Sequence, residues 1–138
     1  VKLLINERAD LEIKGRALSI YGMDYPSATD SLHRLQQEVD PRRFNLLLSH
    51  VPAFAHEQLS EHINLVLSGH THGGQIRLPY LPPFYLPRYS GRFVAGFYQV
   101  SEHQVPLYVS RGVGTSVLPL RFLCRPEIGL FELGGQPA

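Results

Sequence analysis

The sequence predicts an α/β fold, and two similar segments in its middle support that prediction. Residues 45–49 and 63–68 are short apolar runs, which are typical of strands buried on both faces. Residues 53–61 lie between them and have the composition of a helix. Each expected strand is followed closely by a histidine, His50 after the first and His70 after the second. Because ligand sites of open α/β sheets lie beyond the carboxyl ends of the strands, we expect these two histidines to meet there together with His72.

The remaining elements follow from hydrophobic spacing along the 138 residues. A helix is expected over 30–39, because its apolar side chains recur at helical spacing and Asp40-Pro41 ends the pattern. The further strands are expected at 2–5, 17–23, 93–100, 105–110 and 128–133. The sequence shows neither internal repeats nor a linker. Residues 1–138 are therefore interpreted as one portion of a single domain.

The segment from Ser68 to Gln75, Ser-Gly-His-Thr-His-Gly-Gly-Gln, is chemically the most informative part of the chain. It places His70 and His72 two residues apart, so that in extended backbone both imidazoles leave the same face. The flanking glycines allow the chain to turn and a ligand to approach the main chain closely. Imidazole is the commonest metal-binding side chain. The pair therefore indicates half of a metal site, with His50 as a third expected ligand.

Four segments of the chain, and the order in which they occur, resemble the C-terminal half of a calcineurin-like metallophosphoesterase. They are Leu-Ser-His-Val-Pro at 48–52, Leu-Ser-Gly-His-Thr-His-Gly-Gly-Gln at 67–75, Ser-Arg-Gly-Val-Gly-Thr-Ser at 110–116 and Arg-Pro-Glu-Ile at 125–128. The Gly-His-Thr-His-Gly-Gly-Gln signature is similar to that of a bacterial branch of the family. Residues 4–7 and 20–24 look like the stretch after the family's Gly-Asn-His motif. The resemblance therefore covers nearly the whole chain.

The resemblance implies one sheet, with its covering helices, of a four-layer α-β-β-α sandwich whose N-terminal half is absent from this chain. It also implies a centre of two divalent ions (Mn, Fe, Zn or Co), with His50 and His70 at one ion and His72 at the other. The family's Asp-x-His, Gly-Asp-x-x-Asp and Gly-Asn-His motifs do not occur in the sequence. The catalytic residues are therefore expected upstream of Val1. Three neutral histidines cannot offset the charge of two cations, so the chain alone is expected to be inactive.

The implied substrate is a phosphomonoester or phosphodiester, and the resembling branch includes enzymes of lipid-linked phosphates. Arg77 is a candidate for binding the substrate phosphate. The loop between Leu78 and Pro87 follows directly and has four prolines in nine residues. It is interpreted either as an irregular loop packed over a sheet edge or as an apolar lip that touches a lipid chain or a membrane surface.

Composition excludes several other classes of function. The net charge is +1 and the one basic cluster is Arg42-Arg43, so no nucleic-acid-binding patch is expected. The single cysteine, Cys124, excludes an internal disulfide. No apolar run approaches the ~20 residues that cross a bilayer. The protein is expected in the cytoplasm or peripherally at a membrane.

Two alternatives to a two-metal phosphoesterase stay open on the sequence. One is a mononuclear zinc hydrolase that uses His50, His70 and His72 with a bound water, although no general base is evident for it. The other is a noncatalytic module that binds a partner through its apolar loop. The remaining histidines are expected to be solvent-exposed side chains without a role in the site; they are His33, His56, His62 and His103.

Overall fold

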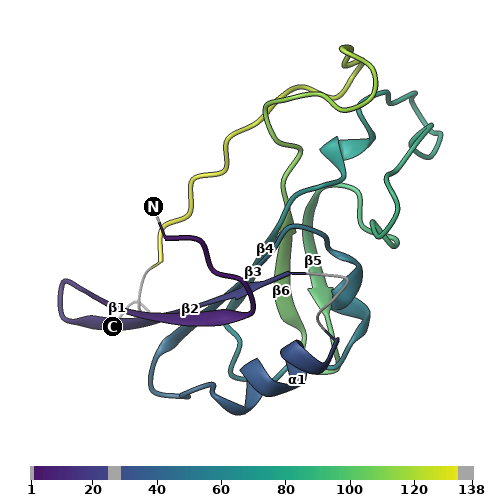
Figure 1. Cartoon of the computed structure of the whole chain (residues 1–138). Coiled ribbons are helices and arrows are strands. Elements are labelled where there is room, and N and C mark those ends of the chain that lie inside the picture. Colours follow the sequence, from purple (N-terminus) through teal and green to yellow (C-terminus); the bar gives the residue numbers. More distant parts are fainter. Residues whose placement is uncertain (1, 25–28, 134–138) are drawn as a thin grey trace.

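A computed structural model describes residues 2–24 and 29–133, which form one six-stranded sheet with an α-helix beside it (Figure 1). The strands are β1 (Glu7–Ile13), β2 (Arg16–Met23), β3 (Phe44–Ser49), β4 (Leu65–Ser68), β5 (Gly96–Val100) and β6 (Val105–Val109). The helix is α1 (Thr29–Gln37). Two short 3-10 turns, η1 (Ala53–His56) and η2 (His72–Gly74), follow β3 and β4. The predicted α/β class is confirmed.

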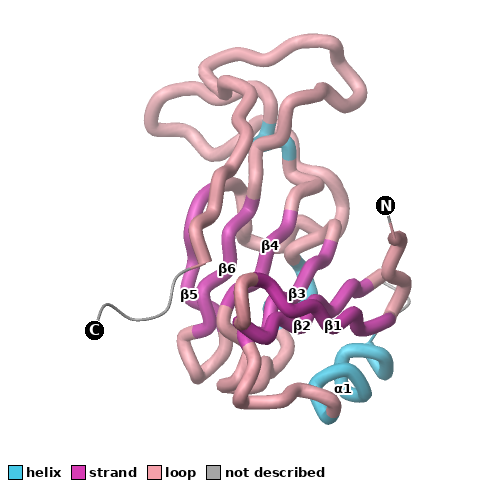
Figure 2. The backbone as a smooth tube through the Cα atoms, turned by 90° about the vertical axis from the view of Figure 1, so that its left-hand side faces the viewer, coloured by secondary structure: helices cyan, strands magenta, loops and turns pink. Residues whose placement is uncertain are grey.

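The sheet is parallel in its centre and antiparallel at its edges. Its order is β1-β2-β3-β4-β6-β5, in which β2, β3, β4 and β6 run parallel. The hairpin β1–β2 and the pair β5–β6 are antiparallel. The parallel strands have their carboxyl ends on the same side of the sheet, and Figure 2 shows long loops gathered beyond these strand ends. At these strand ends the chain can assemble a site from segments far apart in sequence.

The main core lies on the face of the sheet that α1 covers. Leu32 and Leu35 of α1 are buried against Tyr21, Leu47 and Val66 from the central strands. Burying each such aliphatic side chain contributes about 1.5–3 kcal/mol to stability. The helical spacing that predicted α1 thus reflects its packing on the sheet.

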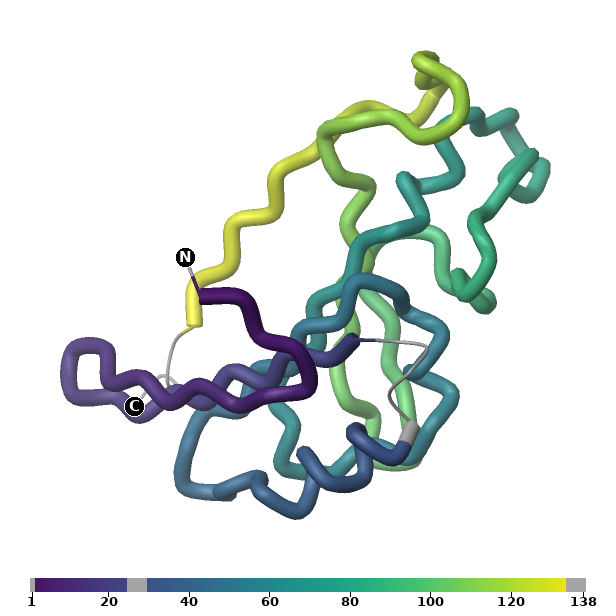
Figure 3. Tube along the Cα trace, in the orientation of Figure 1, coloured from purple at the N-terminus to yellow at the C-terminus, as the bar shows by residue number. Residues whose placement is uncertain are grey.

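The opposite face of the sheet has a smaller apolar cluster. Leu18, Leu46 and Leu65 are buried there, and Phe131 from the C-terminal segment packs against them. Figure 3 shows that segment running back from the loop end of the sheet toward the β1–β2 hairpin. Four further side chains of this face are only partly buried: Ile20, Phe44, Leu48 and Leu67. This face is therefore less completely covered than the face under α1.

Most of the expected elements are present, and three are wrong. Residues 2–5 do not form a strand; Leu4 instead lies so close to Gly22 that an added Cβ would meet the Leu4 Cβ at 2.4 Å. The helix expected over 53–61 is reduced to η1. Residues 128–133 are not a strand, and Ile128 and Leu130 point into solvent. Apolar composition alone misled the prediction in these segments.

Candidate metal centre

His50 and His70 lie side by side because the strands that precede them are parallel neighbours. Ser49 at the end of β3 pairs with Ser68 at the end of β4. The amide of Gly69 donates to the carbonyl of His50 over 3.1 Å, which joins the two strand ends. Of the three histidines expected to meet, His50 and His70 do so, whereas no group of three ligand side chains is found among the described residues.

The imidazoles of His50 and His70 face each other nitrogen to nitrogen. His70 Nδ1 lies 3.2 Å from His50 Nε2, and the ring centroids are 4.9 Å apart. Two nitrogens bound to one tetrahedral ion at ~2.0–2.1 Å would lie about 3.3 Å apart. The observed separation of the two nitrogens therefore fits two ligands of the same ion.

Backbone carbonyls determine which nitrogen of His70 and His72 carries the proton. A carbonyl oxygen only accepts, so His70 Nε2 donates to the carbonyl of Arg88 over 2.7 Å. In the same way His72 Nδ1 donates to the carbonyl of Gly114 over 3.3 Å. The lone pairs are then left on His70 Nδ1 and His72 Nε2. Such a hydrogen bond to the second nitrogen is usual for histidines that bind metals.

The backbone from His70 to His72 forms a turn and not an extended strand. The φ angles of the two histidines are 70° and 50°, so the expectation of an extended backbone is wrong here. Among residues 2–24 and 29–133, no group of three or more His, Cys, Asp or Glu side chains is placed to hold one ion. His50 and His70 form a pair, and His72 lies outside it.

The surroundings of His50 favour its neutral form. Burial lowers the pKa of His50, and the neighbouring His70 and His72 lower it further. A lowered pKa means that less of the imidazole is protonated near neutral pH. The neutral imidazole is the form that binds a metal.

Gly73 and Gly74 let the histidine turn approach other segments closely. Their φ angles are 62° and 78°, in the left-handed region that favours glycine. A Cβ on Gly73 would lie 2.7 Å from Cys124 Sγ, and a Cβ on Gly74 would lie 2.5 Å from Pro83 Cβ. Both backbone conformation and space therefore require glycine here.

Arg121 joins the histidine turn to the loop after β6. Its guanidinium donates to five backbone carbonyls: those of His72, Arg111, Gly112, Gly114 and Cys124. The bond from Arg121 Nε to the Gly114 carbonyl is 3.0 Å long. Because the same carbonyl accepts from His72 Nδ1, Arg121 holds the acceptor that orients the imidazole. Sequence reasoning missed Arg121, since backbone oxygens leave no pattern of residue types.

Arg77 is not among the residues that line the pocket beside His72. With Arg111 and Cys124 it surrounds a cavity of about 490 Å³, which none of the three histidines lines. Within the described residues, Arg77 Nε is buried without a hydrogen-bond partner. Its amide donates to the carbonyl of Phe122 over 2.9 Å, which fixes its backbone. A role for Arg77 at the substrate phosphate stays a prediction.

His50 also lines an open groove at the ends of β2, β3 and β4. The groove has a volume of about 610 Å³ and includes Asp24, Leu4 and Ser68. Ser68 Oγ is buried at this edge without a hydrogen-bond partner in the part of the chain that the structure describes. The groove leaves His50 accessible to further ligands.

The loop from Leu78 to Pro87 exposes its apolar side chains. Tyr80 and Phe84 are 104 % and 87 % exposed, so these two rings do not pack over a sheet edge. The carbonyl of Arg88, just after the loop, is the one that accepts from His70. The loop therefore combines an apolar surface with a contact that orients a histidine.

The four histidines expected to be exposed are exposed: His33, His56, His62 and His103.

Comparison with known proteins gives a consistent group of relatives. The chain is 44% identical over 108 residues to the uncharacterized metallophosphoesterase YkuE of Bacillus subtilis, covering 78% of this chain and 36% of that protein. It is 34% identical over 139 residues to the uncharacterized metallophosphoesterase Cj0846 of Campylobacter jejuni, covering 99% of this chain and 36% of that protein. It is 41% identical over 88 residues to the phosphodiesterase YaeI of Escherichia coli, covering 64% of this chain and 32% of that protein. No family model and no solved structure matches the chain.

The chain spans about a third of the length of these relatives. The helices that the structure describes are too short or too polar to cross a bilayer.

Proposed function

The chain belongs to the metallophosphoesterase family, and we propose that it supplies three histidine ligands to the metal centre of a phosphate-ester hydrolase. The observation that supports this most directly is the pair of backbone carbonyls at Arg88 and Gly114. They accept hydrogen bonds from the N–H groups of His70 and His72, which leaves the other ring nitrogen of each imidazole free to bind metal. Metallophosphoesterases use divalent ions, and imidazole nitrogens suit several of the candidates, Mn, Fe, Zn and Co.

We assign the three histidines to two ions. The 3.2 Å separation of nitrogens suits a shared ion for His50 and His70, whereas His72 lies outside that pair and would serve the second ion. Two ions in such a centre clamp the attacking and leaving oxygens of a phosphoryl transfer and lower the pKa of a bound water. In this assignment the chain's own part is to hold three neutral nitrogens in fixed directions.

The centre needs negative charge that the three histidines do not supply. We propose that carboxylates come from a part of the protein that this chain does not include, since the chain covers 36% of two of its relatives. The groove that holds His50 and Asp24 is the open route by which such ligands would reach the pair. We therefore propose that the chain has little or no activity without that upstream part.

A mononuclear zinc site is a less favoured alternative. It requires His50, His70 and His72 to converge on one ion, and the described residues contain no group of three such ligands. A noncatalytic module is also less favoured, because His70 and His72 have the second-nitrogen hydrogen bonds typical of metal ligands.

The test compares metal content and phosphodiesterase turnover in this chain and in a version extended upstream. We expect about two bound ions and turnover in the extended protein only. His70→Ala and His72→Ala in the extended protein should remove most of the activity and bound metal. His33→Ala changes an exposed histidine of α1 and is the matched control. Unchanged hydrolysis in both site variants, or one ion with turnover in the short chain, would contradict the proposal.

We further propose a lipid-linked substrate and a peripheral contact with a membrane through the Leu78–Pro87 loop. Fully exposed Tyr80 and half-exposed Leu81 support this contact, because such side chains lower their free energy by entering an interface. Sedimentation with vesicles of anionic phospholipid tests it. Tyr80→Asp with Leu81→Asp should abolish binding, whereas Ile128→Asp, another exposed apolar position, should not. Equal sedimentation of all three proteins would overturn the contact.

A further inference from the structure

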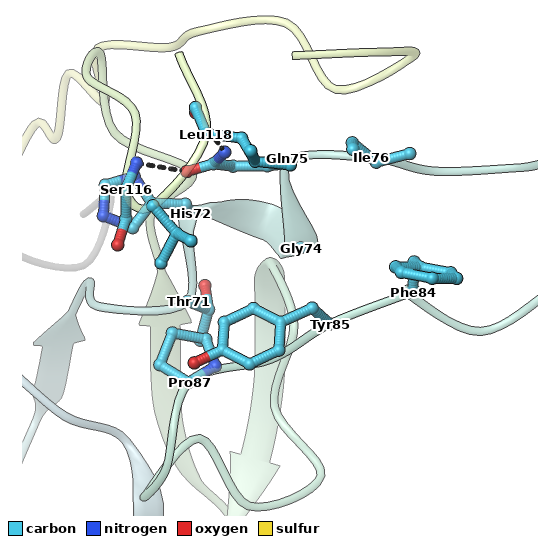
Figure 4. A pocket seen from close by; sticks show the side chains of 11 residues that line it. Thr71, His72, Gly74, Gln75, Ile76, Phe84, Tyr85, Pro87, Ser116 and Leu118 are labelled. Carbon is cyan, nitrogen blue, oxygen red and sulfur yellow. Dashed lines mark hydrogen bonds between the residues drawn. The ribbon is translucent and has the colours of Figure 1, made fainter. Parts of the chain in front are cut away.

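An apolar pocket of about 310 Å³ lies beside His72 (Figure 4). Its walls come from the histidine turn, from the end of the proline-rich loop and from the loop after β6; they include Ile76, Tyr85, Val117 and Leu118. The volume is at the lower end of the ~300–1,000 Å³ usual for ligand pockets. It is about twice that of a ~150 Å³ cavity that accepts benzene. The pocket therefore has room for an organic group larger than one ring.

Most polar groups that line the pocket are already bonded to the chain itself. Gln75 Nε2 donates to the carbonyl of Leu118 over 3.1 Å, and Gln75 Oε1 accepts from the amide of Ser116. Figure 4 shows these bonds holding the Gln75 side chain along one side of the pocket, with Tyr85 on the other. The Thr71 hydroxyl donates to the carbonyl of Val94 over 2.6 Å. A polar ligand would lose hydrogen bonds to water here without replacing them, whereas an apolar ligand would not.

His72 connects the pocket to the candidate metal centre. It lines the pocket, and its Nδ1 donates to the Gly114 carbonyl, so the lone pair of Nε2 is uncommitted. The nitrogen assigned to an ion is thus on a side chain that also borders apolar space. A substrate phosphate held at that ion would have its ester group next to the pocket.

We propose that this pocket binds the apolar organic group of the phosphate ester, an alkyl group about as large as an octyl chain. The proposal rests on the proposed function and adds the place where the ester group binds: phosphate esters of apolar alcohols are preferred over those of small or polar ones because this pocket holds the apolar group. The protein would distinguish these substrates by apolar contact between the ester group and the side chains of the pocket, and not by hydrogen bonding. The pocket and the membrane contact can be tested separately, because Tyr80 and Leu81 do not line this pocket, although Phe84, Tyr85 and Pro87 of the same loop do.

Two diesters with the same leaving group test the proposal. p-Nitrophenyl octyl phosphate and p-nitrophenyl methyl phosphate differ only in the group that the pocket would hold. In the extended protein with Mn(II), we expect kcat/KM for the octyl ester to exceed that for the methyl ester at least tenfold. Val117→Asp should remove this preference. Val113→Asp is the matched control, since Val113 is an exposed valine of the same loop that does not line the pocket.

The outcomes separate the pocket from the proposed chemistry. Equal kcat/KM for the two esters, or equal loss of preference in both valine variants, would overturn the pocket. If neither ester is hydrolysed, the proposed function has failed and calorimetry with octylphosphonate and methylphosphonate decides about the pocket. Tighter binding of octylphosphonate that Val117→Asp removes and Val113→Asp retains supports it; equal dissociation constants contradict it.

Discussion

The imidazoles of His70 and His72 are oriented by backbone oxygens. Arg88 and Gly114 contribute their carbonyls, and Arg121 holds the second of these in place. A carbonyl oxygen can only accept a hydrogen bond, so this arrangement also selects the tautomer of each imidazole. The orientation of these two imidazoles therefore depends on the backbone path of the loops that contain Arg88 and Gly114, and not on the side chains of those loops.

At the residue scale, Arg121→Ala should weaken metal binding without removing a ligand. The guanidinium holds the Gly114 carbonyl that His72 Nδ1 donates to, and loss of such an orienting partner lowers metal affinity ~10–100-fold. Titration of the extended protein with Mn(II), followed by electron paramagnetic resonance, measures the effect. The Mn(II) affinity of Arg121→Lys should lie between those of the unchanged protein and Arg121→Ala, because lysine donates from one nitrogen only.

Arg125→Ala is the control for Arg121→Ala, since Arg125 is an exposed arginine of the same segment. It should leave the affinity for Mn(II) unchanged. An equal decrease in both variants, or a decrease that follows the loss of thermal stability in metal-free protein, would show that Arg121 acts on folding and not on His72.

The meeting of His50 and His70 could be predicted from the sequence, whereas the hydrogen-bond partners of the His70 and His72 imidazoles could not. Apolar runs identify the strands, and a strand end places the next residue at the edge of the sheet. The carbonyls of Arg88 and Gly114 carry no residue-type signal. Their role depends on how two long loops fold back over the turn.

At the element scale, the C-terminal segment is fastened to β6 through Glu127. Its Oε1 accepts from the Tyr108 hydroxyl over 2.8 Å and from the Arg111 amide over 2.9 Å. The Arg111 guanidinium lies 3.4 Å from Glu127 Oε2. The Arg-Pro-Glu-Ile motif thus has a structural role that its position far from the histidines did not suggest.

Acid should weaken this attachment. Burial by itself raises the pKa of Glu127, but the hydrogen bonds from Arg111 and Tyr108 outweigh it and lower the pKa below its ordinary value of 4.5. The ionised carboxylate therefore adds stability that is present above pH ~4.5 and is lost as the pH falls through the lowered pKa. Glu127→Gln should reduce the free energy of unfolding by about 1–3 kcal/mol near pH 7 and by less near pH 3.

Urea unfolding at the two pH values measures the Glu127 effect. Glu132→Gln changes an exposed carboxylate of the same segment and should leave the free energy of unfolding nearly unchanged. A Glu127→Gln deficit that is as large at low pH as at neutral pH would mean that the charge of the carboxylate is not the source of the stabilisation.

Elements with a clear apolar pattern were predictable, and those governed by other forces were not. β2 and α1 bury regular apolar side chains and were recognised. β1 was missed because its sequence, Glu-Arg-Ala-Asp-Leu-Glu-Ile, is largely polar and belongs to an exposed edge strand. Residues 128–133 are apolar but lie along the molecule without pairing, since only Phe131 finds a place in a core cluster.

At the scale of the whole molecule, the two faces of the sheet differ in how completely they are covered. α1 covers one face, while Phe131 is the main cover over Leu18, Leu46 and Leu65 on the other. The family resemblance implies a second sheet over this face. The α/β class was therefore predictable from sequence, whereas the described residues form one sheet and do not include the second sheet that the resemblance implies.

The short chain should consequently associate with itself. Partly buried apolar side chains on the thinly covered face favour dimers or larger species, and they bind an apolar dye. Light scattering and the fluorescence of anilinonaphthalene sulfonate measure both effects. We expect a version extended upstream to show less of each; a monomeric short chain without dye fluorescence would contradict this.

The order of strands in the sheet also sets the order in which the candidate centre can mature. β6 lies between β4 and β5, although it follows both in the chain. As the polypeptide is synthesised, β4 and its histidine turn emerge with one edge unpaired, and β5 has no neighbour until β6 arrives. The Gly114 carbonyl that orients His72 follows β6 and comes later still. His50 and His70 can meet as soon as β3 and β4 pair. The candidate centre would therefore form in two stages: the first brings these two histidines together locally, and the second, which orients His72, depends on insertion of β6.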